Sequence, residues 1–259
     1  MAMYRQRPGP LYQQIADELR AQITDGTLPP GAQLPTEMEL AERFEVTRQT
    51  ARQGLAQLIQ QGLVVSRRPQ GHFVRQWQHM LYRPQAEFMP QPHAPEMDSF
   101  MRAMTSEGRE PTQKIDVAIV TPPPEVAERL HTPDGEMVVV RRRLRSLAGQ
   151  PFHLNDSYFP RSIVGGSEIM SPADIGRGAN TVLAELGHEQ VRALDEIYVR
   201  MPTPDEVHRL SLEQGTPVAL HIVTGFDSED LPVRVVLNVL PSDRHVIVFE
   251  RTRSNSEAE

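Results

Sequence analysis

Apolar residues recur every four positions near the start of the chain. Over Leu11–Ile23 a leucine or isoleucine stands at each fourth residue, so these side chains share one stripe of a helix. Gly26 and the stiff Pro29-Pro30 pair follow, and such residues end helices. The pattern predicts an amphipathic helix over Leu11–Ile23 that buries one face.

Two further helices are predicted from their start signals. Thr36 and Glu39 stand at the spacing of a capping box, in which each side chain bonds to the backbone N–H of the other residue. This helix is expected to end near Phe44. Thr47 is the predicted N-cap of a third helix that runs to about Gln61.

The third helix divides into an apolar and a polar face. Its polar positions include arginine and glutamine, which suit guanine and adenine in the DNA major groove, and threonine, which suits phosphate. The candidate DNA-contacting residues on this helix are Thr47, Arg48, Gln49, Thr50 and Arg52. A merely solvated polar face is the alternative interpretation.

A basic hairpin is predicted directly after this helix. Residues 63–66 and 72–75 are short strand candidates that flank a tip rich in arginine and glycine. The candidate contacts from this tip are Arg67, Arg68, Gln70, Gly71 and His72. Glycine at the tip either serves a turn with positive φ or lets the backbone approach DNA. Three helices followed by a basic hairpin indicate a winged helix-turn-helix.

The second half of the chain contains an internal repeat at an offset of about 80 residues. Pro124–Leu130 matches Pro204–Leu210, and each copy continues into a long strand, a polar turn and a second long strand. Two such units are expected to pair into one antiparallel sheet with helices on one side, which makes the fold class α+β. Chance similarity is the alternative to duplication.

One predicted strand of this half carries three alternating arginines. Arg141, Arg143 and Arg145 share one side of the strand, because side chains alternate with a period of two. Guanidinium groups bind phosphate and carboxylate bidentately, so this face is a candidate anion site. Pairing with nearby acidic residues on a solvated edge is the alternative.

Charge and composition narrow the classes of function. Residues 1–77 hold nine Arg and seven Asp or Glu, a net charge of +2. The rest of the chain has a net charge of −9, which gives the total of −7. A basic head on an acidic body is a weak sign of nucleic-acid contact. The chain has no cysteine, which excludes disulfides and thiolate chemistry. The nine histidines have no metal-binding spacing, and no nucleotide or hydrolase motif occurs, so no cofactor or metal is expected.

The first part of the chain resembles the DNA-binding domain of GntR-family bacterial repressors. The matching stretches are Leu11–Ile15, Gly26–Gly31, Leu34–Glu37, Val46–Arg52 and Gly71–Val74. The resemblance implies DNA contacts by Arg48, Thr50 and Arg52, with Thr47 at the helix start and Gly71 in the wing. It also implies an operator with GT and AC half-elements around a TA centre.

The remainder is similar to the effector domain of the HutC-like branch, the UTRA domain with a chorismate-lyase-like fold. The matching motifs are Arg143-Leu144-Arg145, Gly149-Gln150-Pro151 and Asp243-Arg244. The resemblance implies a ligand site at Arg143 and Arg145, with Arg141 and Tyr158 as further candidates. Sugar-phosphate-sensing relatives carry an acidic residue where this chain has Arg234, which disfavours a hexosamine phosphate and leaves a more anionic or a quite different effector as the alternatives.

These features together predict a cytoplasmic, ligand-responsive repressor. Two subunits are expected to bind a palindromic double-stranded operator as a homodimer, a small-molecule effector is expected to modulate that binding, and no membrane association is expected. The expected parts are a winged helix-turn-helix at 1–76, a linker at 77–95, an effector-binding and dimerisation domain at 96–251 and a flexible tail at 252–259. A lyase-like enzyme for a small anionic substrate and a DNA-binding protein without an effector are the two alternatives.

Overall fold

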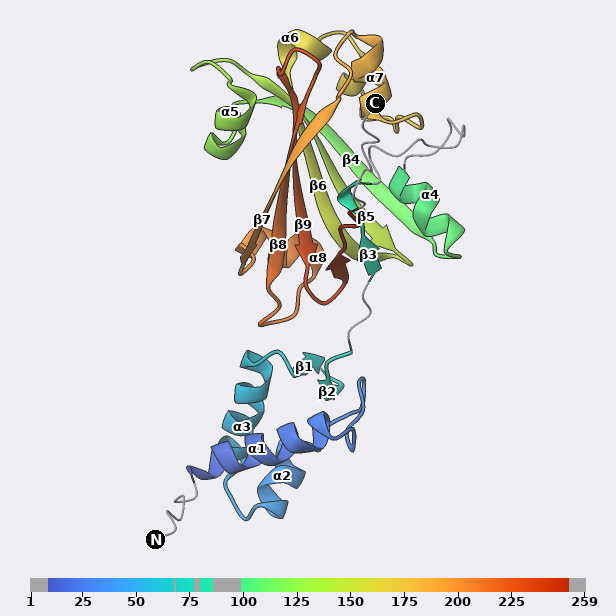
Figure 1. Ribbon diagram of the computed structural model, residues 1–259. Coiled ribbons are helices and arrows are strands. Elements are labelled where there is room, and N and C mark those ends of the chain that lie inside the picture. Colours follow the sequence, from blue (N-terminus) through green and yellow to red (C-terminus); the bar gives the residue numbers. More distant parts are fainter. Residues whose placement is uncertain (1–8, 68, 77–79, 86–98, 252–259) are drawn as a thin grey trace, which may run out of the picture. The chain divides into compact units, whose positions relative to one another are not determined.

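The computed structural model describes residues 9–67, 69–76, 80–85 and 99–251. The chain divides into two compact units, of which the first runs to residue 78 and includes 212–216, and the second comprises the other residues (Figure 1). Most of the predicted linker and the whole predicted tail lie outside the described residues.

The first unit contains three helices and a two-stranded sheet. Its elements are α1 (Leu11–Thr24), α2 (Glu37–Arg43), α3 (Arg48–Gln60), β1 (Val64–Arg67) and β2 (Gly71–Val74). The strands β1 and β2 pair in antiparallel fashion, which confirms the predicted hairpin. The apolar stripes of α1 and α3 meet in one core with Leu40 of α2.

The predicted caps set the directions of α2 and α3. The Thr36 hydroxyl accepts from the Glu39 N–H at 3.2 Å, and the Glu39 carboxylate accepts from the Thr36 N–H at 2.7 Å. This capping box is therefore confirmed. The Thr47 hydroxyl accepts from the Thr50 N–H at 3.2 Å, so α3 begins at Arg48 as predicted.

The second unit is built on a six-stranded antiparallel sheet in the order β4-β5-β6-β9-β8-β7. The strands are β4 (Pro111–Val120), β5 (Val138–Leu147), β6 (Gln150–Pro160), β7 (Arg192–Arg200), β8 (Val218–Phe226) and β9 (Pro232–Pro241). The helix α5 (Pro124–Leu130) follows β4, and α8 (Pro204–Leu210) follows β7. The order is symmetric about the β6–β9 pair, as two copies of strand-helix-strand-strand require. Both copies also end their helix on a left-handed residue, His131 and Ser211.

Helices cover both faces of this sheet, so the prediction of helices on one side was wrong. Helix α5 packs on one face, against Val140, Tyr158 and Val235. The other face packs against α6 (Arg161–Val164), the 3₁₀ turn η2 (Glu168–Met170) and α7 (Ala179–Glu185), which gather at one end of the sheet in Figure 1. The physical reason is that β5 and β6 bury apolar side chains of both parities, so neither of their faces can remain in water.

Three small elements complete the second unit. Strand β3 (Met80–Tyr82) pairs in parallel with β10 (His245–Ile247), and α4 (Ser99–Ser106) packs Phe100 and Met104 against Phe152. Strand β3 falls within the stretch predicted to be a linker, where three residues are too few to show an alternating pattern.

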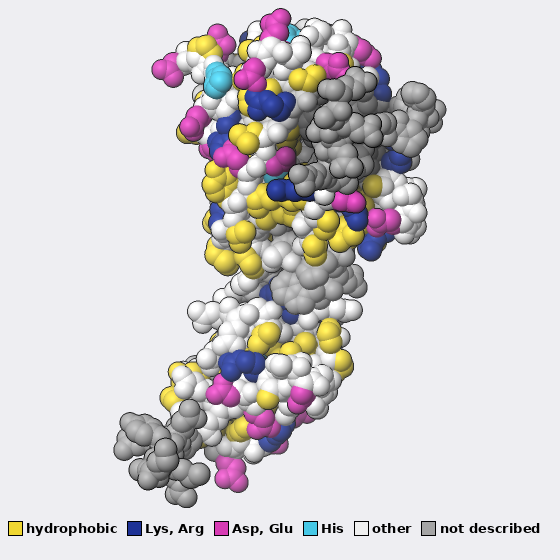
Figure 2. Space-filling model, in the orientation of Figure 1, with side chains coloured by type: hydrophobic (Ala, Val, Ile, Leu, Met, Phe, Trp, Pro, Cys, Tyr) yellow, Lys and Arg dark blue, Asp and Glu magenta, His cyan; other side chains and the backbone are white. Residues whose placement is uncertain are grey.

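Strand β7 is an edge of the sheet and exposes apolar side chains. The exposed ones on and just after this strand are Leu194, Ile197, Tyr198, Val199 and Met201, with Val199 at 78% exposure. Figure 2 shows apolar side chains gathered on this part of the unit, where Figure 1 places β7. Edge strands with apolar side chains are potential pairing surfaces. Among the described residues, no helix is both long and apolar enough to cross a membrane.

Candidate nucleic-acid interface and anion site

The N-terminal turns of α3 present the predicted polar residues to solvent. Thr47, Arg48, Gln49 and Arg52 are exposed, and Thr50 is half-buried. The Arg48 Nε donates to the Glu37 carboxylate at 2.8 Å, while 77% of the Arg48 side chain remains exposed. The carboxylate holds the arginine near the start of α3, while most of the side chain stays in contact with solvent.

The tip of the hairpin lies beside the start of α2. The Gln33 side chain donates to the Gln70 carbonyl at 2.9 Å, and this bond fixes the tip. Gly71 has φ of +115°, a conformation that other residues rarely adopt, and a Cβ there would lie 3.2 Å from the Gln33 amide nitrogen. Arg67 stacks its guanidinium over the Phe73 ring at 5.2 Å. Arg68 lies outside the described residues.

A hollow of about 410 Å³ lies between the start of α3 and the tip of the hairpin. The residues that line it are Gln33, Leu34, Thr36, Glu37, Met38, Arg48, Gly71 and His72. His72 is half-buried at its rim, and this burial lowers the pKa of the imidazole despite the nearby Glu37 carboxylate. The first turn of α3 and the hairpin tip thus line one concave surface together with the start of α2.

The structure separates Arg141 from the other two arginines of β5. Arg141 is fully buried, and its guanidinium donates to the carbonyls of Ile169 at 2.9 Å, Ala173 at 2.8 Å and Ser171. Burial lowers the pKa of Arg141 from its ordinary value, although a guanidinium stays protonated. Arg141 therefore holds the η2 loop against the sheet.

Arg143 and Arg234 converge on one hydroxyl group. Arg143 donates to the Ser157 Oγ at 3.3 Å, and Arg234 on β9 donates to the same atom at 3.4 Å. Arg234 also donates to the Asn180 side chain at the start of α7, at 2.6 Å. Two guanidinium groups that share an uncharged acceptor are placed to share an anion as well.

Arg145 extends this positive region toward α4. Its guanidinium lies 4.6 Å from the centre of the Phe100 ring and 3.4 Å from the His153 Nε2. Burial, followed by the charges of Arg145 and His245, lowers the pKa of His153 well below its ordinary value. His153 is therefore neutral near pH 7 and can accept from Arg145.

Tyr158 is not brought to these arginines. It packs in the core under α5, on the face opposite to Arg143, since it pairs with Val140 rather than with an arginine. Burial raises the pKa of the Tyr158 phenol to about 12. The structure thus brings Arg143 and Arg234 together at Ser157, with Arg145 on the same face of β5, whereas Tyr158 lies on the other face and the Arg141 guanidinium is bonded to the η2 loop.

Several polar residues near this site were missed by the sequence analysis. They are Asn155, Ser157, His221 and Asn238, all of them buried on strands of the second unit. In β6 the signal is a polar residue at every second position, His153, Asn155 and Ser157. His221 and Asn238 are single residues on β8 and β9, and a single polar residue also fits a solvated face. Only the pairing of β6 with β9 and of β9 with β8 shows that three of them adjoin.

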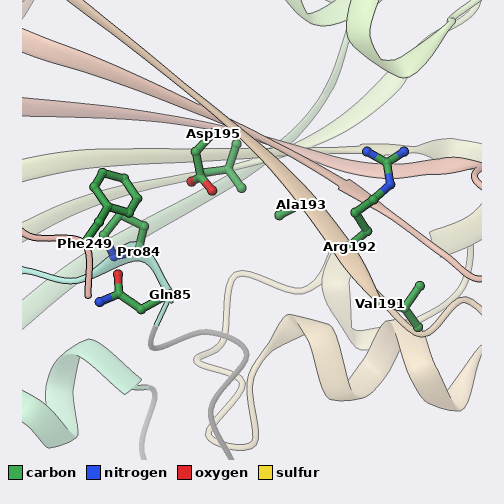
Figure 3. A pocket seen from close by; sticks show the side chains of 8 residues that line it. Pro84, Gln85, Val191, Arg192, Ala193, Asp195 and Phe249 are labelled. Carbon is green, nitrogen blue, oxygen red and sulfur yellow. The ribbon is translucent and has the colours of Figure 1, made fainter. Parts of the chain in front are cut away.

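A pocket of about 310 Å³ lies at the β7 side of the same unit. Figure 3 shows Asp195 on β7 directed toward Pro84, Gln85 and Phe249, all of which line the pocket. The arginines of the predicted anion site are not among its lining residues. No group of three or more His, Cys, Asp or Glu side chains that could hold a metal ion occurs in the part of the chain that the structure describes.

Comparison with known proteins gives two family matches. The UTRA domain model matches residues 106–246, and the model of bacterial regulatory proteins of the gntR family matches residues 11–74. The HTH-type transcriptional repressor NagR of Bacillus subtilis is 28% identical over 98% of this chain and 99% of its own length. An HTH-type transcriptional regulator of Streptomyces coelicolor is 31% identical over 83% of each chain.

A solved structure supports the fold of the whole chain. A crystal structure ascribed to the GntR family has a TM-score of 0.66 at 24% identity, covering 95% of this chain and 99% of that one. At this identity the likeness shows the fold alone. The matched families, the winged head and the duplicated antiparallel sheet agree, and the chain belongs to the GntR family of bacterial transcriptional regulators, in the HutC-like branch whose effector domain is UTRA.

Proposed function

We propose that this regulator reads its operator with the first turns of α3 and the hairpin tip. The observation that carries the proposal is the shared concave surface on which Arg48 and the Gly71–His72 tip meet. Arg48, Gln49 and Arg52 would contact base edges, while Thr47 and Thr50 would donate to phosphate. The DNA backbone or the minor groove next to α3 would be contacted by the hairpin residues Arg67, Arg68 and Gln70.

The regulator is further proposed to act as a homodimer in the cytoplasm. Two copies related by a twofold axis present two α3 helices to a palindromic operator. The apolar edge strand β7 supports this assembly, since Leu194, Val199 and Met201 are exposed on or just after it. Pairing of two β7 strands would cover these side chains and the unpaired backbone edge together.

The effector is proposed to be a small anion held by Arg143, Arg145 and Arg234. The convergence of Arg143 and Arg234 on the Ser157 hydroxyl supports this ligand class. Binding rather than turnover is favoured, because a guanidinium group remains protonated and cannot shuttle a proton. The anion would bind the free and the DNA-bound protein unequally, as any effector of DNA binding must.

Operator binding by an Arg52→Ala variant tests the DNA-reading surface. We expect the variant to bind the DNA upstream of its own coding sequence about 10- to 100-fold more weakly, because one base contact is worth about 1–3 kcal/mol. Gln60→Ala, at the exposed far end of α3, is the matched control and should bind as the parent does. Unchanged operator affinity in Arg52→Ala would contradict the proposed docking of α3.

A further inference from the structure

A row of buried polar side chains crosses the sheet of the effector unit from β5 to β7. Arg143 donates to the Asn155 Oδ1 at 3.2 Å, and the Asn155 amide donates to the Asn238 Oδ1 at 2.6 Å. The Asn238 amide lies 3.5 Å from the Nδ1 of His221, whose Nε2 lies 2.6 Å from the Asp195 carboxylate. The row thus links a residue of the anion site, through three buried side chains, to the edge strand.

Register places these residues side by side. Arg143 is opposite Asn155, Asn155 is opposite Asn238, and Asn238 is opposite His221. All four residues are at most 6% exposed. Burying amides and an imidazole in a sheet is unfavourable unless each is hydrogen-bonded, and valine or leucine would form this face at lower free energy. A polar row in this position therefore suggests a role other than stability.

His221 contacts three polar side chains, those of Asn238, Asp195 and Tyr82. Because the Nε2 lies beside the Asp195 carboxylate, the neutral imidazole carries its proton there and leaves Nδ1 as an acceptor. Two donors face the single lone pair of Nδ1: the Tyr82 hydroxyl at 3.2 Å and the Asn238 amide at 3.5 Å. The Asn238 amide has an alternative acceptor in the His221 carbonyl, also at 3.5 Å. The Asn238 orientation therefore decides whether the Tyr82 hydroxyl shares Nδ1 with a second donor.

Tyr82 belongs to β3, the first described strand after residue 76. Its carbonyl accepts from the Val248 N–H at 2.9 Å, and its ring meets the His221 ring edge-on at 5.5 Å. Pro84 and Gln85, which follow β3, line the pocket that Asp195 also lines (Figure 3). The polar row thus ends at the segment through which the chain of the DNA-binding unit enters the effector unit.

We propose that this row couples the anion site to β3 and that Tyr82 transmits the change in the row to β3. The proposal rests on the proposed function of the anion site. An anion on Arg143 competes for the N–H groups that hold Asn155, so the Asn155 and Asn238 amides can reorient. A reoriented Asn238 directs its Oδ1 toward His221 in place of its NH2 group, so the Tyr82 hydroxyl no longer shares Nδ1 with a second donor, and the contact of His221 with β3 changes. Two alternative hydrogen-bond arrangements of one row are the two-state element that such coupling requires.

Hydrogen exchange of the full chain with inorganic phosphate as the probe tests this coupling. In the parent protein, phosphate should change amide exchange in residues 80–85 relative to chloride at equal ionic strength. Tyr82→Phe keeps the ring and removes only the hydroxyl, and it should reduce this change at least about fivefold while phosphate affinity stays within about twofold. Asp195→Ala, which frees the His221 tautomer, should reduce the change as well. Tyr12→Phe, which removes a hydroxyl from the other unit, is the matched control and should respond like the parent.

Two outcomes would overturn different claims. If phosphate does not bind, or binds equally well to Arg143→Gln, the proposed anion site is wrong and the coupling fails with it. If phosphate binds through Arg143 but residues 80–85 of Tyr82→Phe and Asp195→Ala respond as in the parent, the anion site stands and the proposed role of Tyr82 is wrong.

Discussion

The three alternating arginines of β5 show what a residue pattern can and cannot predict. Alternation predicts that Arg141, Arg143 and Arg145 share a face, and the register of β5 with β6 agrees. It cannot predict that the Arg141 guanidinium donates its hydrogen bonds to the carbonyls of Ile169, Ser171 and Ala173, because the η2 loop has no periodic pattern in the sequence. The sequence pattern also cannot predict the contact between Arg234 and Ser157, because the two residues are 77 positions apart in the chain.

Asp156, on the α5 face of the sheet, gives a prediction about pH. Burial raises the pKa of its carboxyl to about 6, against the opposing charges of Arg209 and Arg142. The folded protein therefore binds this proton more tightly than the unfolded chain, so the contribution to stability falls as pH rises from about 4 to about 6. Asp156→Asn should be more stable than the parent at pH 7, by on the order of 2 kcal/mol, and should show no such advantage near pH 4.

Urea unfolding at both pH values measures this difference. Asp116→Asn is the matched control, because its carboxyl stands on the same face but is 68% exposed. If the stability of the parent relative to Asp156→Asn is the same at both pH values, the raised pKa of the buried Asp156 carboxyl is contradicted.

At the scale of elements, helices with start signals were predictable and short unpatterned ones were not. The Thr36 capping box and the Thr47 cap mark α2 and α3 in the sequence, and the structure has both. Helix α6 has four residues and η2 has three, which is less than the length at which a helical stripe becomes visible. These missed elements are the ones that cover the second face of the sheet.

The close approach of α1 and α3 predicts an intolerant glycine. A Cβ at Gly54 would lie 2.9 Å from the Tyr12 carbonyl oxygen and 3.0 Å from the Ile15 Cγ2. Alanine is the better helix former by about 1 kcal/mol. The backbone clash outweighs that gain, so Gly54→Ala should lower the free energy of unfolding of the first unit by about 1–3 kcal/mol.

Thermal unfolding followed by circular dichroism measures the effect of Gly54→Ala. Gln60→Ala on the same helix changes an exposed residue and should leave the melting temperature nearly unchanged. A Gly54→Ala protein as stable as the parent would show that the two helices do not pack at this distance.

At the scale of the whole molecule, the edge strand predicts the assembly. Val199 is 78% exposed, so Val199→Asp should not affect folding but should place a charge in the proposed β7–β7 contact. Light scattering should give twice the chain mass of 29.2 kDa for the parent and a mass near one chain for Val199→Asp. Leu231→Asp, at another exposed apolar residue, should remain dimeric. A dimeric Val199→Asp protein would place the interface elsewhere.

Fluorescence anisotropy measures whether the first unit, with α3 and the β1–β2 hairpin, reads a DNA sequence. A labelled duplex from upstream of the coding sequence is compared with a scrambled duplex at two salt concentrations. We expect the protein to bind the upstream duplex at least about 10³-fold more tightly than the scrambled duplex, and we expect this preference to persist at the higher salt concentration. Equal affinity for both duplexes, falling steeply with salt, would mean that the first unit contacts phosphate alone and would contradict sequence reading by α3.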